Sequence, residues 1–191
     1  RGHGGLETGG GTSGGEGFAR RPRRAMTTVR PERPGDAAAI RRIADAAFSP
    51  MSFSDGSEGA IIDALRDNGD LTLSLVADDA GEVVGHVAFS PVRIGADHGG
   101  WFGLGPVAVR PDRQRQGIGA KLIRSGLAVL KEQGAAGVVL IGDPAYYTRF
   151  GFANDGLVSY LDVPTANVFH LILNGPARQG AITYAPALHG A

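Results

Sequence analysis

The sequence predicts one α/β domain of the α+β type, built on a mixed β-sheet, and three observations support this fold class. Short segments with β-type patterns, bounded by Gly and Pro, alternate with longer segments whose apolar residues repeat at helical spacing. A tight turn joins two early strand segments and implies antiparallel pairing, whereas a long helix separates two later ones, as in a parallel crossover. Hydrophobic residues make up 42% of the 191 residues, which is enough for a sizeable core.

Residues 1–25 differ in composition from the rest of the chain. They hold nine of the 31 glycines and few large apolar side chains. Such a segment cannot bury enough apolar surface to offset its ordering entropy, so we expect disorder. Its arginines are not followed by the apolar stretch that an export signal requires. Met26 resembles an ordinary start of translation, which predicts that residues 1–25 are an upstream extension and that residues 26–191 form a single domain.

One strand and two helices open this domain. Residues 27–30 have a β-type pattern that ends at the prolines behind them. Asp36 is expected as the N-cap of a helix that ends before Pro50. A second helix is expected to begin after Ser57 and to end at Asn68-Gly69. Each helix has one apolar stripe, formed by Ile40, Ile43, Ala44, Ala47 and Phe48 in the first and by Ile61, Ile62 and Leu65 in the second.

Three strands are expected next as an antiparallel unit. The turn Asp79-Ala80-Gly81 is short enough to join residues 71–77 and 83–94 as a hairpin, and residues 101–109 extend it. Pro106 lies inside the third strand and cannot donate to sheet hydrogen bonding, so it marks a β-bulge, an edge or a strand start. A bulge would leave backbone donors free to bind an extended, amide-bearing ligand as another strand would.

A long helix and further strands complete the sheet. The helix runs from about Gly117 to Gln133, and its apolar side is formed by Leu122, Ile123, Gly126, Leu127 and Leu130. Residues 138–141 are a continuous apolar run, typical of a strand that is buried on both faces. Two late strands are expected near residues 158–163 and 168–173.

The segment Gln114-Arg115-Gln116-Gly117-Ile118-Gly119 joins a strand to the long helix. Free N–H groups at a helix N-terminus attract anions, and glycine lets the backbone approach them closely. With Arg113 nearby, the segment is a candidate diphosphate site, and the alternative is an ordinary strand-to-helix turn. Leu122 stands where the third glycine of a Rossmann fingerprint would be, and no Gly-Lys-Ser/Thr of a P-loop is present.

Composition and motif content exclude several function classes. Nineteen basic and nineteen acidic residues give zero net charge, which removes the electrostatic basis for nucleic-acid binding. No apolar run approaches the roughly 20 residues of a membrane helix. The absence of Cys excludes disulfides, thiolate metal sites and a cysteine nucleophile, and it is compatible with the cytoplasmic location that we expect. No pattern of His or carboxylates has the spacing of metal ligands, so no metal is expected.

Three motifs, in order, resemble the GCN5-related N-acetyltransferase (GNAT) superfamily. Residues 107–119 contain a Gln-x-x-Gly-x-Gly core similar to its acyl-CoA motif, and residues 145–152 resemble its Phe-Tyr-x-x-x-Gly-Phe segment. The resemblance covers about residues 27–188. Three segments resemble more closely the bacterial predicted acetyltransferases of the YhbS type, namely 104–109, 142–152 and 180–187.

This resemblance implies a GNAT-like acyl-CoA N-acyltransferase fold in which the strands at residues 101–109 and 138–141 splay apart to admit acetyl-CoA, the acetyl donor. Pantetheine amides would pair with the backbone of Val107 and Val109. The pyrophosphate would be held by the N–H groups of Gln114, Arg115, Gln116, Gly117, Ile118 and Gly119. The superfamily transfers the acetyl group directly to an amine, through a tetrahedral oxyanion, and coenzyme A leaves as a thiolate.

The implied chemistry needs an oxyanion donor and a general acid. The N–H of Val107 or Ala108, beside the expected bulge, is the candidate donor. Tyr147 lies four residues before Gly151 and matches the family's tyrosine; it is uncharged at neutral pH and can protonate the leaving thiolate. The alternative for Tyr147 is an aromatic anchor in the core, and Tyr146 is expected to pack there.

The sequence leaves the remaining polar candidates open. The amine is deprotonated either through water or by one of four residues, Glu82, His86, His98 and Asp143. His170 is expected to be a partly exposed strand residue. Lys121 and Arg124, one turn into the long helix, either lie in solvent or reach an adenosine 3′-phosphate.

Two functions from different classes follow. The first is an N-acetyltransferase whose acceptor is a small amine, an amino acid derivative, or a protein N-terminus or lysine. The second is a non-catalytic acyl-CoA-binding or regulatory module. A nucleotide-phosphate binder unrelated to coenzyme A is disfavoured, because a P-loop lysine and magnesium-binding carboxylates are missing. The expected partners are acetyl-CoA and the acceptor, without nucleic acid or membrane, and the protein is expected to be a monomer or a homodimer.

Overall fold

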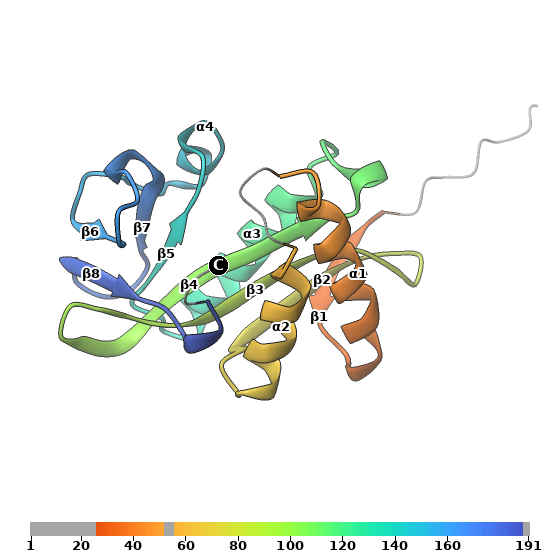
Figure 1. The fold of residues 1–191 in the computed structure, drawn as a ribbon, viewed down its shortest axis with the longest axis horizontal. Helices are drawn as coiled ribbons and strands as arrows, with labels where there is room; N and C mark the ends of the chain where they lie inside the picture. Colours follow the sequence, from red (N-terminus) through yellow and green to blue (C-terminus); the bar gives the residue numbers. More distant parts are fainter. Residues whose placement is uncertain (1–25, 52–55, 189–191) are drawn as a thin grey trace, which may run out of the picture.

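The computed structural model describes residues 26–51 and 56–188. The expected disorder of residues 1–25 therefore lies outside the described part. Figure 1 shows a twisted sheet with helices on both faces. Its elements, in chain order, are β1 Thr28–Pro31, α1 Ala37–Phe48, α2 Glu58–Asp67, β2 Leu73–Asp79, β3 Glu82–Ile94, β4 Asp97–Val109, α3 Ile118–Glu132, β5 Gly137–Ile141, α4 Pro144–Tyr147, β6 Val158–Ser159, β7 Val168–Ile172 and β8 Gly180–Thr183. Short 3-10 helices lie at Pro34–Asp36, Pro111–Arg113, Thr148–Phe150, Thr165–Asn167 and Pro186–Leu188.

The sheet is mixed, as the sequence predicts. Its strand order is β1-β2-β3-β4-β5-β7, with β8 paired to β3 and β6 paired to β8. β1 to β4 are antiparallel neighbours, and β4 and β5 are parallel. α1 and α2 lie in front of the sheet in Figure 1, and α3 lies behind it. Neighbouring residues of β2 show the two layers, since Leu75 packs with α3 and Val76 with α1.

The two N-terminal helices bury the predicted stripes. Ile40, Ile43, Ala44 and Ala47 of α1 are buried against the sheet together with Ile62 of α2. Ile61 and Leu65 of α2 are buried against Ala185 in the C-terminal segment. The side chain of Asp36, at the N-cap position of α1, does not cap the helix. Its carboxylate accepts a hydrogen bond from the Arg33 N–H at 2.8 Å and pairs with the Arg30 guanidinium at 2.6 Å. Asp36 thus ties the start of α1 to β1.

α3 packs closely on the sheet because a glycine faces it. The predicted apolar side of α3 is buried, and it includes Gly126. A methyl group at Gly126 would lie 2.3 Å from Cε2 of Phe89 on β3, whose side chain is fully buried. The absence of a side chain at this position therefore sets the distance between α3 and the sheet.

Gly126→Ala is expected to lower the free energy of unfolding by about 1–3 kcal/mol, because the new methyl group overpacks the core against Phe89. Alanine has the better helix propensity by about 1 kcal/mol, so the two effects have opposite signs. Urea denaturation followed by circular dichroism measures the difference. A more stable variant would show that propensity outweighs the clash and that the contact is soft.

The two central strands separate where the sequence predicts a splay. β4 and β5 are paired only over Trp101 to Gly103, opposite Gly137 to Val139. Beyond Gly103, β4 continues beside β3 alone. The register between β3 and β4 shifts at this point, so that Gly105 and Pro106 together face the single residue Ala88. Pro106 therefore lies in a bulge, and the mouth between β4 and β5 opens beside it.

The C-terminal part differs most from the prediction. β6 has two residues rather than the six expected over 158–163, and it pairs with β8 rather than with the central strands. β8, Gly180–Thr183, was not predicted as a strand. It places Ile182 in a core cluster with Trp101 and Val139, and it leads the chain back to α2, where Ala185 packs against Ile61 and Leu65.

Candidate active site

A cleft of about 1070 Å³ opens at the splay between β4 and β5. One side is formed by the bulged part of β4 and the end of β5, through Leu104, Gly105, Pro106, Val107, Ile141 and Gly142. The other side is formed by the end of α1, the start of α2 and the C-terminal segment, through Phe48, Met51, Ser57, Glu58, Ile61 and Leu188. Gly103, Asp143, Tyr147, Val163, Asn167 and Tyr184 complete its lining.

The cleft and the predicted phosphate loop approach the splay from different faces of the sheet. α1 and α2, which wall the cleft, lie on one face, and α3, which begins at the loop, lies on the other (Figure 1). Tyr147 belongs to both sides, because it lines the cleft and packs against the core beneath α3. The cleft and the loop therefore lie on opposite faces of the sheet, and Tyr147 contributes to both.

The N-terminus of α3 has the geometry of an anion site. Gly117 is the N-cap, with a left-handed φ of +82°, and no acidic residue lies in the first turn. The first intrahelical bond runs from the Lys121 N–H to the Gly117 C=O at 3.0 Å. The N–H groups that precede it have no partner inside the helix, namely those of Ile118, Gly119 and Ala120. These donors lie at the positive end of the helix dipole.

The loop before the helix is organised by its own side chains. The Gln114 side-chain amide donates to the Val109 C=O at the end of β4, and the Gln116 side-chain amide donates to the Asp112 C=O. The Arg113 guanidinium pairs with Asp79 at 2.5 Å, so its charge is balanced within the protein. Arg115 is exposed and adopts a φ of +58°. Of the two arginines expected beside a phosphate, Arg115 is therefore the one that lies in solvent.

The backbone of β4 presents alternate residues to the gap. The Arg110 N–H donates to the Val84 C=O at 2.9 Å, so the backbone groups of Arg110 face β3. Hydrogen-bonded and non-hydrogen-bonded pairs alternate in an antiparallel ladder, so Ala108 also faces β3. Val107 and Val109 consequently turn their N–H and C=O groups toward the gap that β5 leaves.

Tyr147 lies between the cleft and the core beneath α3. It is the last residue of α4, and its ring packs edge-on against Phe152, with the centroids 6.4 Å apart. Gly142, at the end of β5, makes room for the ring, because a Cβ at this position would lie 2.2 Å from its Cε2. Burial raises the pKa of the Tyr147 hydroxyl to about 12. The side chain therefore keeps its proton at neutral pH.

Tyr146 packs as expected and also reaches the loop. Its ring contacts those of Tyr147 and Phe150 edge-on, with centroids 5.0 Å and 5.5 Å apart. Its hydroxyl would lie 3.1 Å from a Cβ at Gly119, so it stands beside the first turn of α3. Arg149 covers its outer face at 4.8 Å. Burial raises the pKa of Tyr146.

Lys121 and Arg124, which were expected either to lie in solvent or to reach an adenosine 3′-phosphate, both contact other parts of the protein. The Lys121 ammonium donates to the Thr27 C=O, which ties α3 to the residue that precedes β1. The Arg124 guanidinium lies 5.2 Å from the centroid of the Phe150 ring, a cation–π contact. These contacts place both residues on the outer side of α3.

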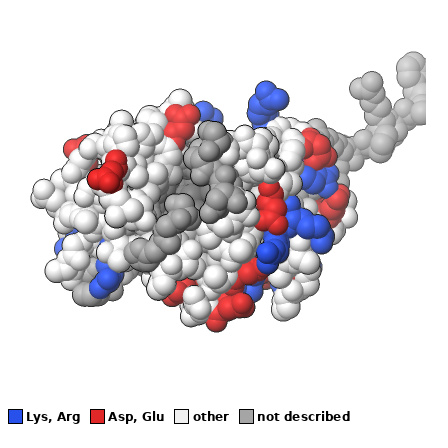
Figure 2. Space-filling view, viewed as in Figure 1, with Lys and Arg blue, Asp and Glu red and all other residues white. Residues whose placement is uncertain are grey.

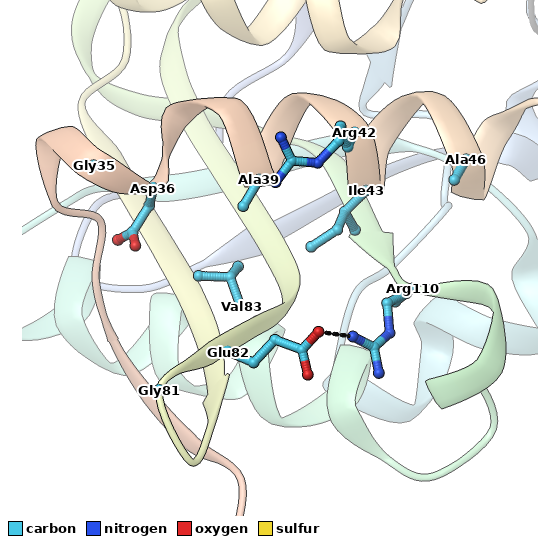
Figure 3. A pocket seen from close by; sticks show the side chains of 10 residues that line it. All are labelled: Gly35, Asp36, Ala39, Arg42, Ile43, Ala46, Gly81, Glu82, Val83 and Arg110. Atoms are coloured by element: carbon cyan, nitrogen blue, oxygen red, sulfur yellow. Dashed lines mark hydrogen bonds and ion pairs between the residues drawn. The ribbon is translucent and has the colours of Figure 1, made fainter.

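Two of the four candidate bases, Glu82 and His86, lie outside the cleft. Glu82 pairs with Arg110 and lines a separate pocket of about 440 Å³ beneath α1 (Figure 3). His86 is fully buried beneath α1 and α2, and its Nε2 lies 2.8 Å from the Ser74 Oγ. Burial and, to a smaller extent, the charge of Arg66 lower the pKa of His86 to about 3. Neither residue lines the cleft.

The other two candidates have different outcomes. The side chain of His98 lies outside the described part. Asp143 lines the cleft, but its carboxylate accepts a hydrogen bond from the Ala145 N–H at 2.8 Å and caps α4.

The cleft lining also includes polar residues that the sequence analysis did not name as candidates, among them Glu58 and Tyr184. The alternating pattern after Gly180 was the available signal for the strand that leads to Tyr184.

The prediction for His170 is wrong. The residue is 5% exposed on β7, and its Nε2 lies 2.9 Å from the Asp155 Oδ1. Asp155 belongs to the connection between α4 and β6, and Ala153 in the same segment pairs with His170 through backbone hydrogen bonds. This segment pairs with β7 at His170, which is why His170 is buried rather than partly exposed.

None of the helices among the described residues is long and apolar enough to cross a membrane. Within residues 26–51 and 56–188, no three His, Asp or Glu residues gather as metal ligands would. On the face shown in Figure 2, Lys and Arg side chains lie interspersed with Asp and Glu.

Comparisons with known proteins agree with this geometry. The uncharacterized N-acetyltransferase YhbS of Escherichia coli K12 is 44% identical over 125 residues, which cover 65% of this chain and 72% of the relative. A GNAT family acetyltransferase from Brucella melitensis, solved with acetyl-CoA, has a TM-score of 0.76 and 49% identity, over 85% of this chain and 97% of that one. The E. coli YhbS structure, solved with CoA, has a TM-score of 0.74 and 35% identity, over 84% and 91%.

The sequence pattern of the acetyltransferase (GNAT) family itself matches residues 37–152. This match includes α1, the bulge of β4, the loop before α3 and Tyr147, and it extends over more than half of the chain. The protein belongs to the GNAT family of acetyltransferases.

Proposed function

We propose that this protein is an N-acetyltransferase that transfers the acetyl group of acetyl-CoA directly to a primary amine. The observation that carries the proposal is the splay of β4 from β5 beside a helix N-terminus with free N–H groups. A relative with 49% identity over 85% of this chain was solved with acetyl-CoA, which supports the same cosubstrate here.

The residues present fit the pyrophosphate and the pantetheine arm of acetyl-CoA. The N–H groups of the predicted loop would hold the pyrophosphate at the N-terminus of α3 from Arg115 to Gly119, because the Gln114 N–H donates to the Pro111 C=O at 3.4 Å. Val107 and Val109 turn their backbone groups to the gap and would pair with the pantetheine amides as a neighbouring strand does. When bound, acetyl-CoA supplies an acetyl group that is activated as a thioester.

Two groups of the chain would serve the transfer. Of the two candidate oxyanion donors, Val107 is preferred over Ala108, because the Ala108 N–H faces β3. Tyr147 would donate its proton to the sulfur as the carbon–sulfur bond breaks and the carbon–nitrogen bond forms. The proton lost by the attacking nitrogen replaces the one that Tyr147 gives, so amine and acetyl-CoA yield the amide and coenzyme A.

The alternative is a module that binds acyl-CoA without chemistry. The position of Tyr147 favours the enzyme, because this residue both lines the cleft and packs against the core beneath α3. A module that only binds would need no acid at that point.

Calorimetric titration of the full chain with acetyl-CoA, coenzyme A and ATP tests the binding step. A thiol-release assay on the same sample, across a panel of amines and lysine-containing peptides, tests the transfer. We expect binding of acetyl-CoA and coenzyme A but not ATP, and thiol release with at least one amine. Binding without release from any member of the panel would favour the binding module, and no binding would refute the assignment of the loop.

A further inference from the structure

Two tyrosine side chains line the cleft, and each packs on a glycine where the two central strands separate. Tyr147 packs on Gly142, which directly follows β5. Tyr184, which directly follows β8, packs on Gly103 of β4, because a Cβ at this glycine would lie 2.6 Å from the Tyr184 Cε1. Gly103 is also the last residue of β4 that pairs with β5. The ring of Tyr184 therefore lies at the base of the splay.

The ring of Tyr184 is held in place, whereas its hydroxyl is open to a ligand. The ring packs edge-on against Tyr160, with the centroids 5.1 Å apart, beside the apolar cluster that contains Trp101. Among the described residues the hydroxyl has no hydrogen-bond partner, and its oxygen is not enclosed by the protein. Since the residue lines the cleft, the open side of this oxygen faces the cleft. Burial raises the pKa of Tyr184, so the hydroxyl is neutral at physiological pH.

Tyr184 approaches the splay from the side of α1 and α2. Leu104, the neighbour of Gly103, packs in the core beneath α3, so the side of Gly103 that meets Tyr184 faces away from α3. Ala185 packs against Ile61 of α2, and in Figure 1 the blue segment after β8 runs back toward α2. The predicted phosphate loop lies on the opposite face, at the start of α3. Tyr184 thus stands on the face that acetyl-CoA leaves to the second substrate.

The direction of attack gives this position a chemical use. In the proposed transfer the pantetheine runs along β4 and the thioester oxygen points to the Val107 N–H, so the plane of the thioester is close to that of the sheet. A nucleophile attacks a carbonyl carbon from outside that plane. The attacking nitrogen would therefore enter from the side of α1 and α2, beside the Tyr184 hydroxyl, while Tyr147 gives its proton to the sulfur.

We infer that Tyr184 binds the attacking nitrogen and orients it. The hydroxyl oxygen accepts a hydrogen bond from one N–H of the neutral primary amine, which leaves the lone pair free to attack the thioester carbon. The second N–H supplies, through water, the proton that replaces the one given by Tyr147. The product amide keeps the first N–H, so the bond to Tyr184 persists through the reaction. This inference rests on the proposed acetyl transfer and adds the residue that holds its acceptor.

A primary amine and its N-methyl derivative separate this role from a structural one. A neutral secondary amine has one N–H, which it loses in the reaction, so none remains for Tyr184. Three pairs from the amine panel cover the open acceptor classes, namely phenethylamine, alaninamide and a peptide with one lysine, each with its form methylated on the reacting nitrogen. Thiol release gives kcat and KM for both members of each pair, in the wild type and in Tyr184→Phe.

Tyr184→Phe keeps the ring on Gly103 and the edge contact with Tyr160, and it removes only the hydroxyl. We expect it to lower kcat/KM for the primary amine about fivefold to tenfold, the value of one hydrogen bond, and to leave that for the N-methyl amine within about twofold. The loss should appear in KM rather than in kcat, because the bond is present before and during the attack. Acetyl-CoA affinity, measured by calorimetry, should stay at the wild-type value.

Tyr160→Phe is the matched control, because it removes a hydroxyl from the neighbouring ring, which does not line the cleft. It should keep the wild-type kcat and KM for both members of each pair. An equal loss for the primary and the N-methyl amine in Tyr184→Phe would overturn the inference, as would a loss in kcat alone, which is the result expected of a hydroxyl that donates to the oxyanion.

The outcomes separate this inference from the proposed function. Absence of acetyl-CoA binding, or binding without thiol release from any of the amines, contradicts the acetyltransferase itself. Release from at least one primary amine, with its KM unchanged in Tyr184→Phe, leaves the acetyltransferase standing and removes Tyr184 from acceptor binding.

Discussion

Replacing Gly117 with valine is expected to weaken acetyl-CoA binding at least about 100-fold. Gly117 caps α3 with a φ of +82°, a conformation that β-branched residues avoid. Valine would turn the backbone and move the N–H groups that follow it away from the phosphates. Loss of two hydrogen bonds to a charged group, each contributing about 1.5 kcal/mol or more, corresponds to this factor. Calorimetric titration with acetyl-CoA measures the change.

Gly134→Val is the matched control for this prediction. Gly134 follows α3 at the opposite end, has a φ of +81°, and, like Gly117, has no other atom within 4 Å of a new Cβ. The two variants should therefore lose similar stability through the backbone, while only Gly117→Val loses the ligand. Equal loss of binding in both would attribute the effect to unfolding. Wild-type affinity in Gly117→Val would show that the loop does not hold the pyrophosphate.

Removal of the Tyr147 hydroxyl is expected to slow acetyl transfer about 100-fold or more, the usual contribution of a general acid. Phenylalanine keeps the ring contacts with Phe152 and Phe169, so acetyl-CoA affinity should stay within about twofold. Steady-state thiol release and calorimetry measure the two quantities. Tyr160→Phe is the control, because this buried ring contacts Tyr184 and does not line the cleft. Full activity in Tyr147→Phe would exclude the hydroxyl from the mechanism.

The pH dependence of kcat gives a second test of Tyr147. Deprotonation removes the acid, so activity falls as pH rises through the pKa of this hydroxyl. Burial raises that pKa to about 12, above the value near 10 of an exposed tyrosine. We expect no decline of kcat from this group between pH 8 and about 11. A descending limb centred near 10 that is absent from Tyr147→Phe would show that the hydroxyl is solvated during catalysis.

Local patterns in the sequence predicted the parts of the protein that depend on nearby residues. The apolar spacing from Ile40 to Phe48 predicted α1, and that from Leu122 to Leu130 predicted the buried side of α3. Pro106 predicted the bulge among three alternatives, because the missing N–H of proline interrupts a ladder wherever it occurs. Residues 114–119 predicted a strand-to-helix turn, and the first N–H groups of α3 have no partner inside the helix, which again depends only on nearby residues.

The tertiary structure decided what depends on segments that are distant in sequence. Glu82, His86 and Asp143 each carry a group that can accept a proton, so the sequence could not choose among them. In the structure each group has a partner, namely Arg110, Ser74 and the Ala145 N–H, and none of the three stands out as the base. His170 is buried because the connection after α4 covers its strand. Glu58 and Tyr184 meet in one cleft only because β8 returns the chain to α2. Hydrophobic periodicity gives the face on which a side chain lies, but the partner across that face is set by the folding of the whole chain.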